Sequence, residues 1–331
     1  MKTFIPAIIF AILLVISAAA ICSANDKVAE DRNDRVERWL AFVDNMKYER
    51  EKIVSAIVRG KGERTLTSEF DGESITVTGP IEYFLAFDFA GGNMRVDRHE
   101  LGFTRDGELE RRLGQFVETR SSIEWCSSRP GQQWSEVIFV ARPKPAYHEL
   151  RQSGHCSPLD IRDLGHMGRH RFINGPVRSE SPWFSDRMER IKGRIPEVFV
   201  EEENGIIRYE YQNRMEEYGI LIRRVTWVDT KNGFTDIRHK SIYEYDSQEF
   251  QPRIDYDTRV SWKQKEGVWV PVEIIFDATQ HGGPKPTPER LVMTFDWESL
   301  NEPVDDKYFS YRDFGLSNQS VVTSLPMPVI P

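Results

Sequence analysis

The stretch that decides the fold runs from residue 267 to residue 276 and reads GVWVPVEIIF. Every second position in it is apolar, at Val268, Val270, Val272, Ile274 and Phe276. Side chains two residues apart point to the same face of a β-strand. The stretch therefore predicts a strand with one buried face and one largely wet face.

The same alternation recurs along much of the chain, between glycine-containing turn signals. Strands are predicted around Tyr83, Leu85, Phe87 and Phe89, around Ile207, Tyr209 and Tyr211, and around Leu291, Met293, Phe295 and Trp297. The turn signals are Asp71-Gly72, Gly91-Gly92-Asn93, Asn204-Gly205, Asn232-Gly233 and Glu266-Gly267. Short strands joined by such turns predict sequential antiparallel hairpins.

Two segments have the period of a helix instead. Between about Asp31 and Glu51, apolar residues recur at helical spacing, namely Val36, Trp39, Leu40, Val43 and Met46. A shorter helix is predicted between Ser181-Pro182 and Gly193. The predicted fold class is mainly β (α+β), with a strongly curved antiparallel sheet or half-open β-barrel of about ten strands and both helices on its concave side.

The first 24 residues have the order of a secretory signal peptide. Lys2 precedes an apolar run from Ile5 to Ile21, and Cys22-Ser23-Ala24 offers small residues for cleavage after Ala24. A membrane anchor and a lipid-modified Cys22 are the alternatives. We therefore expect export to the periplasm or the extracellular space, and a single mature domain over residues 25–331 with a less regular insertion at about 100–196.

Composition and charge exclude several classes of protein. The formal net charge is −8 without any basic run, which argues against a nucleic-acid partner. No other apolar stretch is long enough for a stable membrane span. An oxidising compartment favours a disulfide between Cys126 and Cys156, and the alternative is two buried thiols.

The sequence predicts no catalytic residue, no metal site and no cofactor, so we expect a protein that is not an enzyme. Asn301-Glu302-Pro303 matches a glycosidase tripeptide, but no glutamate follows it as nucleophile, which favours a strand exit. His155, Cys156, His166 and His170 lie close together without a zinc spacing. Nucleophile-elbow, P-loop and dinucleotide motifs are missing.

Several segments resemble the secreted LolA/LppX-like group of lipoprotein carriers, often labelled outer-membrane lipoprotein-sorting proteins. They are the N-terminal helix with residues 57–62 (IVRGKG), the hairpin 87–98 (FDFAGGNMRVDR), the strand 267–271 (GVWVP), and the stretch from 295–297 (FDW) to 305–309 (DDKYF). The resemblance implies a half-open β-barrel closed by helices over an apolar cavity that holds acyl chains. It also implies a functional arginine, for which Arg59, Arg95 and Arg223 are the candidates.

The residues themselves also favour an apolar cavity, because a curved sheet with a helix across its mouth leaves a concave surface. Its predicted lining is Trp39, Leu40, Val43, Phe87, Val270, Val272, Ile274, Met293 and Phe295. The predicted function is an exported protein that binds or carries a lipid or lipoprotein acyl chain. The alternative is a cell-envelope structural or interaction scaffold whose interior is filled, and the sequence indicates no particular protein partner.

Overall fold

The computed structural model describes a set of stretches that together hold the sheet, two helices and several short helical turns. They are residues 33–70, 73–103, 109–119, 123–128, 137–141, 160–166, 184–216, 219–245, 253–281, 287–310, 312 and 321–325. The predicted signal peptide lies outside these residues. No helix among the described residues is long and apolar enough to cross a membrane.

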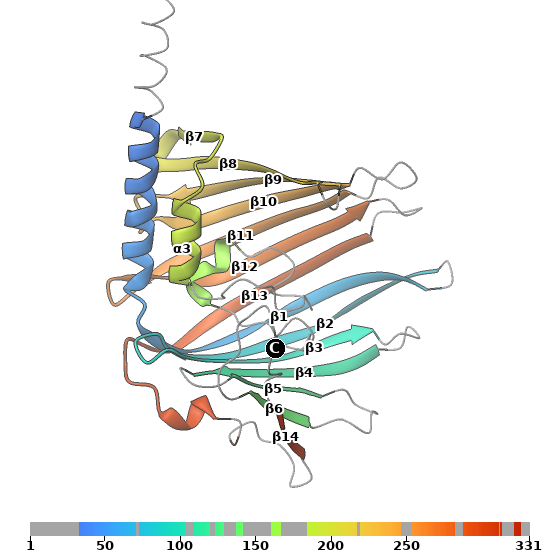
Figure 1. Ribbon diagram of the computed structural model, residues 1–331. Helices are drawn as coiled ribbons and strands as arrows, with labels where there is room; N and C mark the ends of the chain where they lie inside the picture. The colour runs from blue at the N-terminus through green and yellow to red at the C-terminus, as the bar shows by residue number, and fades with distance from the viewer. Residues whose placement is uncertain are drawn as a thin grey trace, which may run out of the picture.

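One large sheet dominates the molecule and consists of two antiparallel meanders (Figure 1). The first meander comprises β1 (Ser55–Phe70), β2 (Glu73–Asp88), β3 (Asn93–Phe103), β4 (Leu109–Glu118), β5 (Ile123–Ser128) and β6 (Val137–Ala141). The second comprises β7 (Val198–Glu201), β8 (Ile206–Met215), β9 (Ile220–Asp229), β10 (Thr235–Tyr245), β11 (Arg253–Lys265), β12 (Val268–His281) and β13 (Thr287–Leu300). β14 (Val321–Leu325) extends the first meander by pairing in parallel with β6.

The described part of the chain thus has fourteen strands in the order β14-β6-β5-β4-β3-β2-β1-β13-β12-β11-β10-β9-β8-β7. The mainly β class, the antiparallel hairpins and both helices are confirmed, whereas the sequence predicts only about ten strands. The strands at and near the two edges, β6, β7 and β14, have four or five residues each. Such short segments are too brief to show an alternation.

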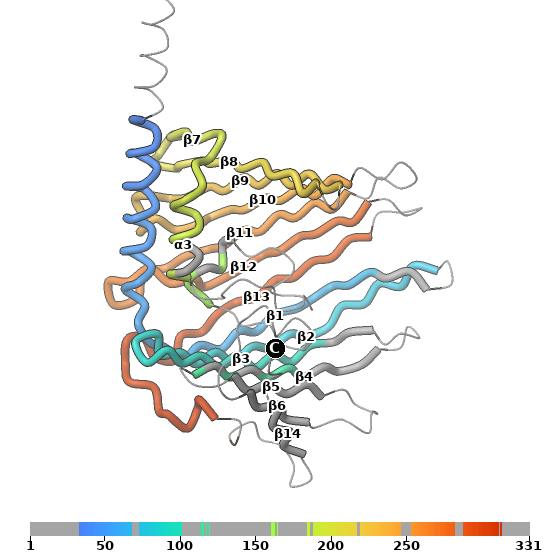
Figure 2. The backbone as a smooth tube through the Cα atoms, viewed as in Figure 1, coloured from blue at the N-terminus to red at the C-terminus, as the bar shows by residue number. Residues whose placement is uncertain are grey.

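The two meanders meet where β1 pairs with β13, so segments from opposite ends of the described chain lie side by side (Figure 2). The pairing runs from Ala56 opposite Leu300 to Leu66 opposite Glu289. Gly62 lies in this contact, and a Cβ atom there would come within 1.9 Å of the Val292 carbonyl oxygen. Glycine therefore permits the close approach of the two central strands.

The predicted turns among the described residues join the strands as the sequence indicates, whereas Asp71-Gly72 lies outside the described residues. At the β11–β12 hairpin both Glu266 and Gly267 have positive φ, 53° and 80°, and at the β7–β8 connection Asn204 and Gly205 have φ of 63° and 78°. Two successive residues with positive φ are the requirement of a type I′ turn. Such turns match the right-handed twist of the flanking strands.

One face of the sheet, called the inner face here, carries the larger apolar core. It is the face to which Val58, Leu85, Ile274 and Met293 point, and all four are buried. The sheet residues of this core are Ala56, Val58, Ile81, Tyr83, Leu85, Phe87, Met94, Val96, Ile222, Tyr243, Tyr256, Val260, Val268, Val270, Ile274, Phe276, Ala278, Leu291, Met293, Phe295, Trp297 and Leu300.

Both helices pack on the part of the inner face formed by β7, β8 and β9. Residues 33–51 form the N-terminal helix, and α3 (Phe184–Lys192) lies beside it (Figure 1). Trp39 contacts Phe199 and Tyr209 edge to face, with ring centroids 5.5 and 5.1 Å away. The second buried cluster comprises Trp39, Phe42, Val43, Met46, Phe184, Met188, Tyr209 and Val228.

The region from about residue 100 to residue 196 contributes both to the sheet and to its cover. β4, β5 and β6 continue the first meander, whereas the 3-10 helix η2 (Ile161–His166) packs against β10, β11 and β12. A buried carboxylate ties this cover together, because Asp160 accepts hydrogen bonds from Arg162 and from the backbone N–H of Phe184 at 2.8 Å. The start of α3 is therefore linked to η2.

Shorter elements complete the structure on the opposite, outer face and at the strand ends. The 3-10 turn η5 (Asp306–Phe309) places Phe309 against Ala86 and Val117, and η3 (Glu203–Gly205) connects β7 to β8. Asn301 follows β13, and its side chain accepts a hydrogen bond from the Val54 N–H at 2.8 Å. The segment 301–303 is therefore a strand exit that fastens β13 to the start of β1.

Candidate ligand-binding face

Most of the predicted cavity-lining residues of the sheet lie together on the inner face. Phe87, Val270, Ile274, Met293 and Phe295 are all buried members of the larger core. Val272 is half-buried and packs against the same core. A bulge in the pairing of β12 with β11 falls at this residue, because Ser261 pairs with Glu273 and Trp262 pairs with Pro271.

The predicted lining residues of the N-terminal helix lie elsewhere. Trp39 and Val43 belong to the cluster over β7, β8 and β9, and Leu40 is half-buried. The structure therefore brings six of the nine predicted residues to one core and places the helix stripe in the neighbouring one. The period of the helix indicates which residues are apolar and aligned, but not which strands they contact.

Few described residues cover the larger core from outside the sheet. Its members beyond the strands are Ile53, which precedes β1, and Ile161 and Leu164 of η2. Arg162 lies between the latter two, and its guanidinium stacks over the Phe89 ring at 3.4 Å. The described residues from outside the sheet therefore contribute few apolar side chains to this core, whose members are all at most 9% exposed.

Among the described residues, a group of charged side chains that comprises two arginines and two glutamates interrupts the apolar inner face. Arg64 donates hydrogen bonds to Glu100 at 2.6 Å and to Glu289 at 2.9 Å, and Arg98 lies 3.2 Å from the second Glu100 oxygen. The side chains of Arg64, Glu100, Glu289 and Arg98 are only 5, 0, 7 and 5% exposed. These four residues, from β1, β3 and β13, are called the charged quartet below.

The charged quartet is not among the residues predicted from the sequence, although the sequence contains a signal for it. Arg64 has the same parity as Val58 and Gly62 on β1, and Glu289 has the same parity as Leu291 and Met293 on β13. Residues of one parity share one face of a strand. The alternation therefore identifies Arg64 and Glu289 as charged residues at inward positions, provided that β1 and β13 are known to extend to these residues.

A second polar group lies on the inner face of β9 and β10. His239 is buried between two hydroxyl groups, with Nδ1 2.9 Å from Thr226 Oγ1 and Nε2 2.8 Å from Ser241 Oγ. The inner face therefore combines a broad apolar surface with a few defined polar groups. This combination is typical of binding sites for small amphiphilic molecules.

The end of the N-terminal helix is held by another buried cation. The Arg50 guanidinium stacks over the Trp262 ring at 3.7 Å, donates a hydrogen bond to the Phe234 carbonyl at 3.0 Å, and lies 3.6 Å from Asp236. Cation–π contacts between desolvated groups stabilise by about 2 kcal/mol. Arg50 therefore fixes the helix to β10 and β11.

The three arginines suggested by the resemblance do not lie on the inner face. Arg59 pairs with Glu298, and Arg223 lies 3.7 Å from Glu244, all at exposed positions of the outer face. Arg95 is buried under η5, where it pairs with Asp97 at 2.6 Å. The buried arginines of the inner side are Arg50, Arg64, Arg98 and Arg162.

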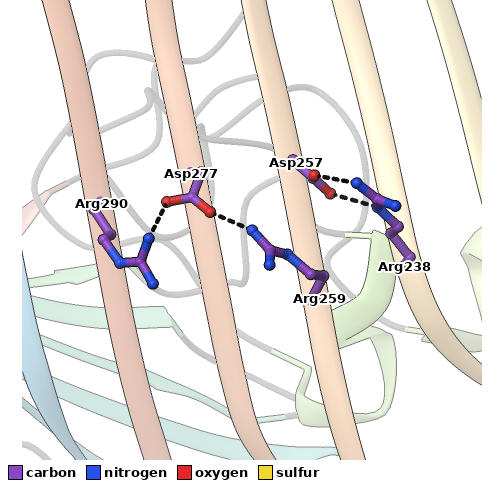
Figure 3. A network of polar contacts seen from close by, with 5 residues as sticks. All are labelled: Arg238, Asp257, Arg259, Asp277 and Arg290. Carbon is purple, nitrogen blue, oxygen red and sulfur yellow. Dashed lines mark hydrogen bonds and ion pairs between the residues drawn. The ribbon is translucent and has the colours of Figure 1, made fainter.

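The outer face carries an exposed row of alternating charges across four strands (Figure 3). Arg238 donates two hydrogen bonds to Asp257, and Asp277 accepts from both Arg259 and Arg290. Burial raises the pKa of the Asp257 carboxyl, but the hydrogen bonds and the charge of Arg238 outweigh it and hold this pKa below its ordinary value. The row keeps this face polar.

The other predicted groups fall partly outside the described residues. Cys126 lies on β5, but its side chain and the whole of Cys156 lie outside them, so the disulfide stays a prediction. His155 and His170 also lie outside, and the side chain of His166 in η2 is not described. Among the described residues, no group of three or more histidine, cysteine, aspartate or glutamate side chains could hold a metal ion.

The sheet and its two helices place the chain in the class of mainly β proteins with helices packed on an apolar sheet face. No protein family model matches the sequence, and no curated protein matches it. Solved structures do match, among them a LolA superfamily protein from Nitrosomonas europaea, with 12% identity, a TM-score of 0.37, and coverage of 81% of this chain and 97% of that chain.

Two further structures are similar over comparable lengths. A DUF1329 family protein from Desulfovibrio piger is 10% identical, with a TM-score of 0.33, and covers 82% of this chain and 97% of its own. A β-barrel-like DUF1849 protein from Brucella abortus is 10% identical, with a TM-score of 0.30, and covers 75% and 100%. The neighbours include the superfamily that the sequence resembles, but these scores are low, and the proposals below rest on the residues of this chain.

Proposed function

We propose that this protein is exported, has no catalytic activity, and binds the acyl chain of a lipid or lipoprotein against the inner face of its sheet. The supporting observation is the larger core, which extends across β3, β2, β1, β13 and β12. By comparison, η2 contributes only Ile161 and Leu164 to it among the described residues. Burial of apolar surface contributes about 25 cal/mol per Å². Because the core side chains on these strands are only 0–8% exposed, a bound acyl chain would replace part of the chain's own cover over this face.

The test is saturable binding of a fluorescent fatty acid by the purified chain from Asn25 onward. Val272→Glu places a carboxylate among the apolar side chains at the edge of the core, and a charge facing an apolar space is costly. We expect this variant to bind the fatty acid about tenfold or more weakly. The readout is fluorescence against ligand concentration, with circular dichroism to verify folding.

Ile275→Glu is the matched control, because Ile275 is half-buried on the same strand but points to the outer face, where it pairs with Arg259 and Val292. Its affinity should equal that of the wild type. Absence of saturable binding by folded wild-type protein would reject the proposal and favour the scaffold, in which the chain's own side chains fill the inner face.

A further inference from the structure

The short strand β7 forms one edge of the sheet, and among the described residues no strand lies on its outward side (Figure 1). Its pairing with β8 covers the other side. Pro196 precedes this strand, and the turn at Asn204-Gly205 follows it. Residues 197–202 are therefore a defined segment with one free side, called the open edge below.

The backbone of the open edge has hydrogen-bonding groups that point away from β8. The Glu202 N–H donates a hydrogen bond to a carbonyl group of β8 at 2.6 Å. Alternate residues of an antiparallel strand bond to the same neighbour, so Val198 and Val200 also direct their backbone groups to β8. Phe199 and Glu201 therefore direct theirs to the open side. Unpaired groups of this kind are a template for an additional strand.

The side chains of the open edge place apolar groups between two carboxylates. Glu197, Phe199 and Glu201 share one face of the strand, and Val198 and Val200 share the other. Phe199 is half-buried, both glutamates are exposed, and Val200 is 43% exposed. A neighbouring strand would thus contact apolar side chains at its centre and a carboxylate toward each end.

The charge of the open edge determines which partner it can accept. Residues 195–205 contain four glutamates and no lysine or arginine. Glu202 lies 3.0 Å from an arginine of β8. A second copy of the chain, paired antiparallel about Phe199, would place Glu197 opposite Glu201, and like charges directly opposite each other are destabilising. The carboxylates therefore oppose self-association and favour a basic partner.

We infer that the open edge binds an extended, basic segment of a partner protein by antiparallel strand addition. In this mode, main-chain hydrogen bonds provide affinity and alternate side chains provide specificity. The complementary segment has a lysine or arginine opposite each of Glu197 and Glu201, and β-branched residues between them. The open edge is separate from the larger core of the inner face, so this inference does not depend on acyl-chain binding.

The probe is a labelled peptide with the core Lys-Val-Thr-Val-Lys, and its counterpart Glu-Val-Thr-Val-Glu has the same centre with the opposite charge. Fluorescence anisotropy with the purified chain from Asn25 onward measures both affinities. The wild type should bind the basic peptide about tenfold more tightly than the acidic one. This preference should diminish in about 1 M salt, where charges are screened within about 3 Å.

Glu197→Lys/Glu201→Lys should reverse the preference, because the edge then presents two cations. Glu197→Gln/Glu201→Gln keeps the shape of both side chains and should reduce the preference to less than about twofold. Glu63→Lys/Glu82→Lys is the matched control, since it makes the same change of net charge at exposed positions of the central strands β1 and β2. It should keep the preference for the basic peptide, and circular dichroism verifies the folding of each variant.

N-methylation of the basic peptide separates strand addition from electrostatic attraction alone. The central threonine lies opposite Phe199, whose backbone groups face the open side, so its own N–H bonds to β7. Methylation of this N–H should weaken binding about tenfold or more. Methylation of the N–H of the preceding valine, which faces away from β7, should weaken it by less than about threefold.

Several outcomes would overturn the inference. Equal affinity for both peptides, or a control variant that loses the preference as the edge variant does, would show that the edge carboxylates do not select the partner. Equal effects of the two methylations would exclude strand addition. Absence of binding by the folded wild type would show that the charges of the open edge only prevent pairing with other strands.

Discussion

At the scale of single residues, Gly62 decides how closely the two halves of the sheet approach. Its Cβ position is 1.9 Å from the Val292 carbonyl oxygen and 2.7 Å from the Met293 Cα atom, both of which are backbone. Backbone atoms in the centre of a sheet cannot move aside as the end of a flexible side chain can. The requirement for glycine is therefore steric, since Gly62 is not among the residues with positive φ.

Gly62→Ala should lower the free energy of unfolding by about 1–3 kcal/mol or more, as overpacking of a filled interior does. Urea denaturation followed by circular dichroism measures the change. Gly193→Ala is the control, because the nearest atoms to its Cβ position are 3.7 Å away, an ordinary contact. A Gly62→Ala protein as stable as the wild type would contradict the close approach of β1 and β13.

Asp257 links stability to pH at the residue scale. Its pKa is held below the ordinary value of 3.8 by Arg238, against the opposing effect of burial. A carboxyl with a lowered pKa in the folded state stabilises the fold above its unfolded pKa, and this contribution is lost as the pH falls through the folded pKa. The pair is partly exposed, so solvent screens it and its contribution is small.

Asp257→Asn should lower the free energy of unfolding by about 0.5–1 kcal/mol at pH 7. The difference from the wild type should disappear as the pH falls below about 3.8, and it should shrink in about 1 M salt, where charges are screened within about 3 Å. Chemical denaturation at several pH values measures it. A difference that grows on acidification would contradict the assigned ion pair.

At the scale of elements, the cover of the inner face depends on the link between η2 and α3. Asp160 accepts two hydrogen bonds from the Arg162 side chain and one from the first N–H of α3, and both side chains are buried. Because orphan N–H groups at a helix start need an acceptor, this carboxylate fixes α3 as well as Arg162. The two short elements thus form one unit on the inner face.

Asp160→Asn should cost about 3–5 kcal/mol, because it leaves the buried Arg162 guanidinium without its counter-charge. Hydrogen exchange of the α3 amides should accelerate together with the loss of global stability in denaturant. The double variant Asp160→Leu/Arg162→Met removes both charges and should be more stable than the single variant. Equal stability of wild type and Asp160→Asn would show that the link does not hold the cover.

At the scale of the whole molecule, the proposed ligand should stabilise the native state. A ligand that binds only the folded protein adds about 2.7 kcal/mol at about 100 times its dissociation constant. We therefore expect saturating fatty acid to raise the denaturant midpoint by the corresponding amount. Acetate, which lacks the chain, is the control, and an unchanged midpoint with fatty acid would favour the filled scaffold.

Local patterns in the sequence determined the class of fold and, for most of the predicted strands, which residues share the buried face. The alternation at Leu291 and Met293, the turn at Glu266-Gly267 and the helix stripe with Trp39 each follow from the preferences of neighbouring residues. These preferences act over a few positions, so they are readable without the tertiary structure. They predicted the inward residues of β12 and β13 and the two helices.

Only the tertiary structure decided which faces and strands meet. The pairing of β1 with β13, the packing of the N-terminal helix on β7 to β9 and the meeting of Arg64, Glu100 and Glu289 join segments far apart in the chain. A period of two specifies which side chains share a face, but it contains no information about the neighbouring strand or its register. Those choices depend on the packing of the whole sheet, which is why the charged quartet emerged only from the structure.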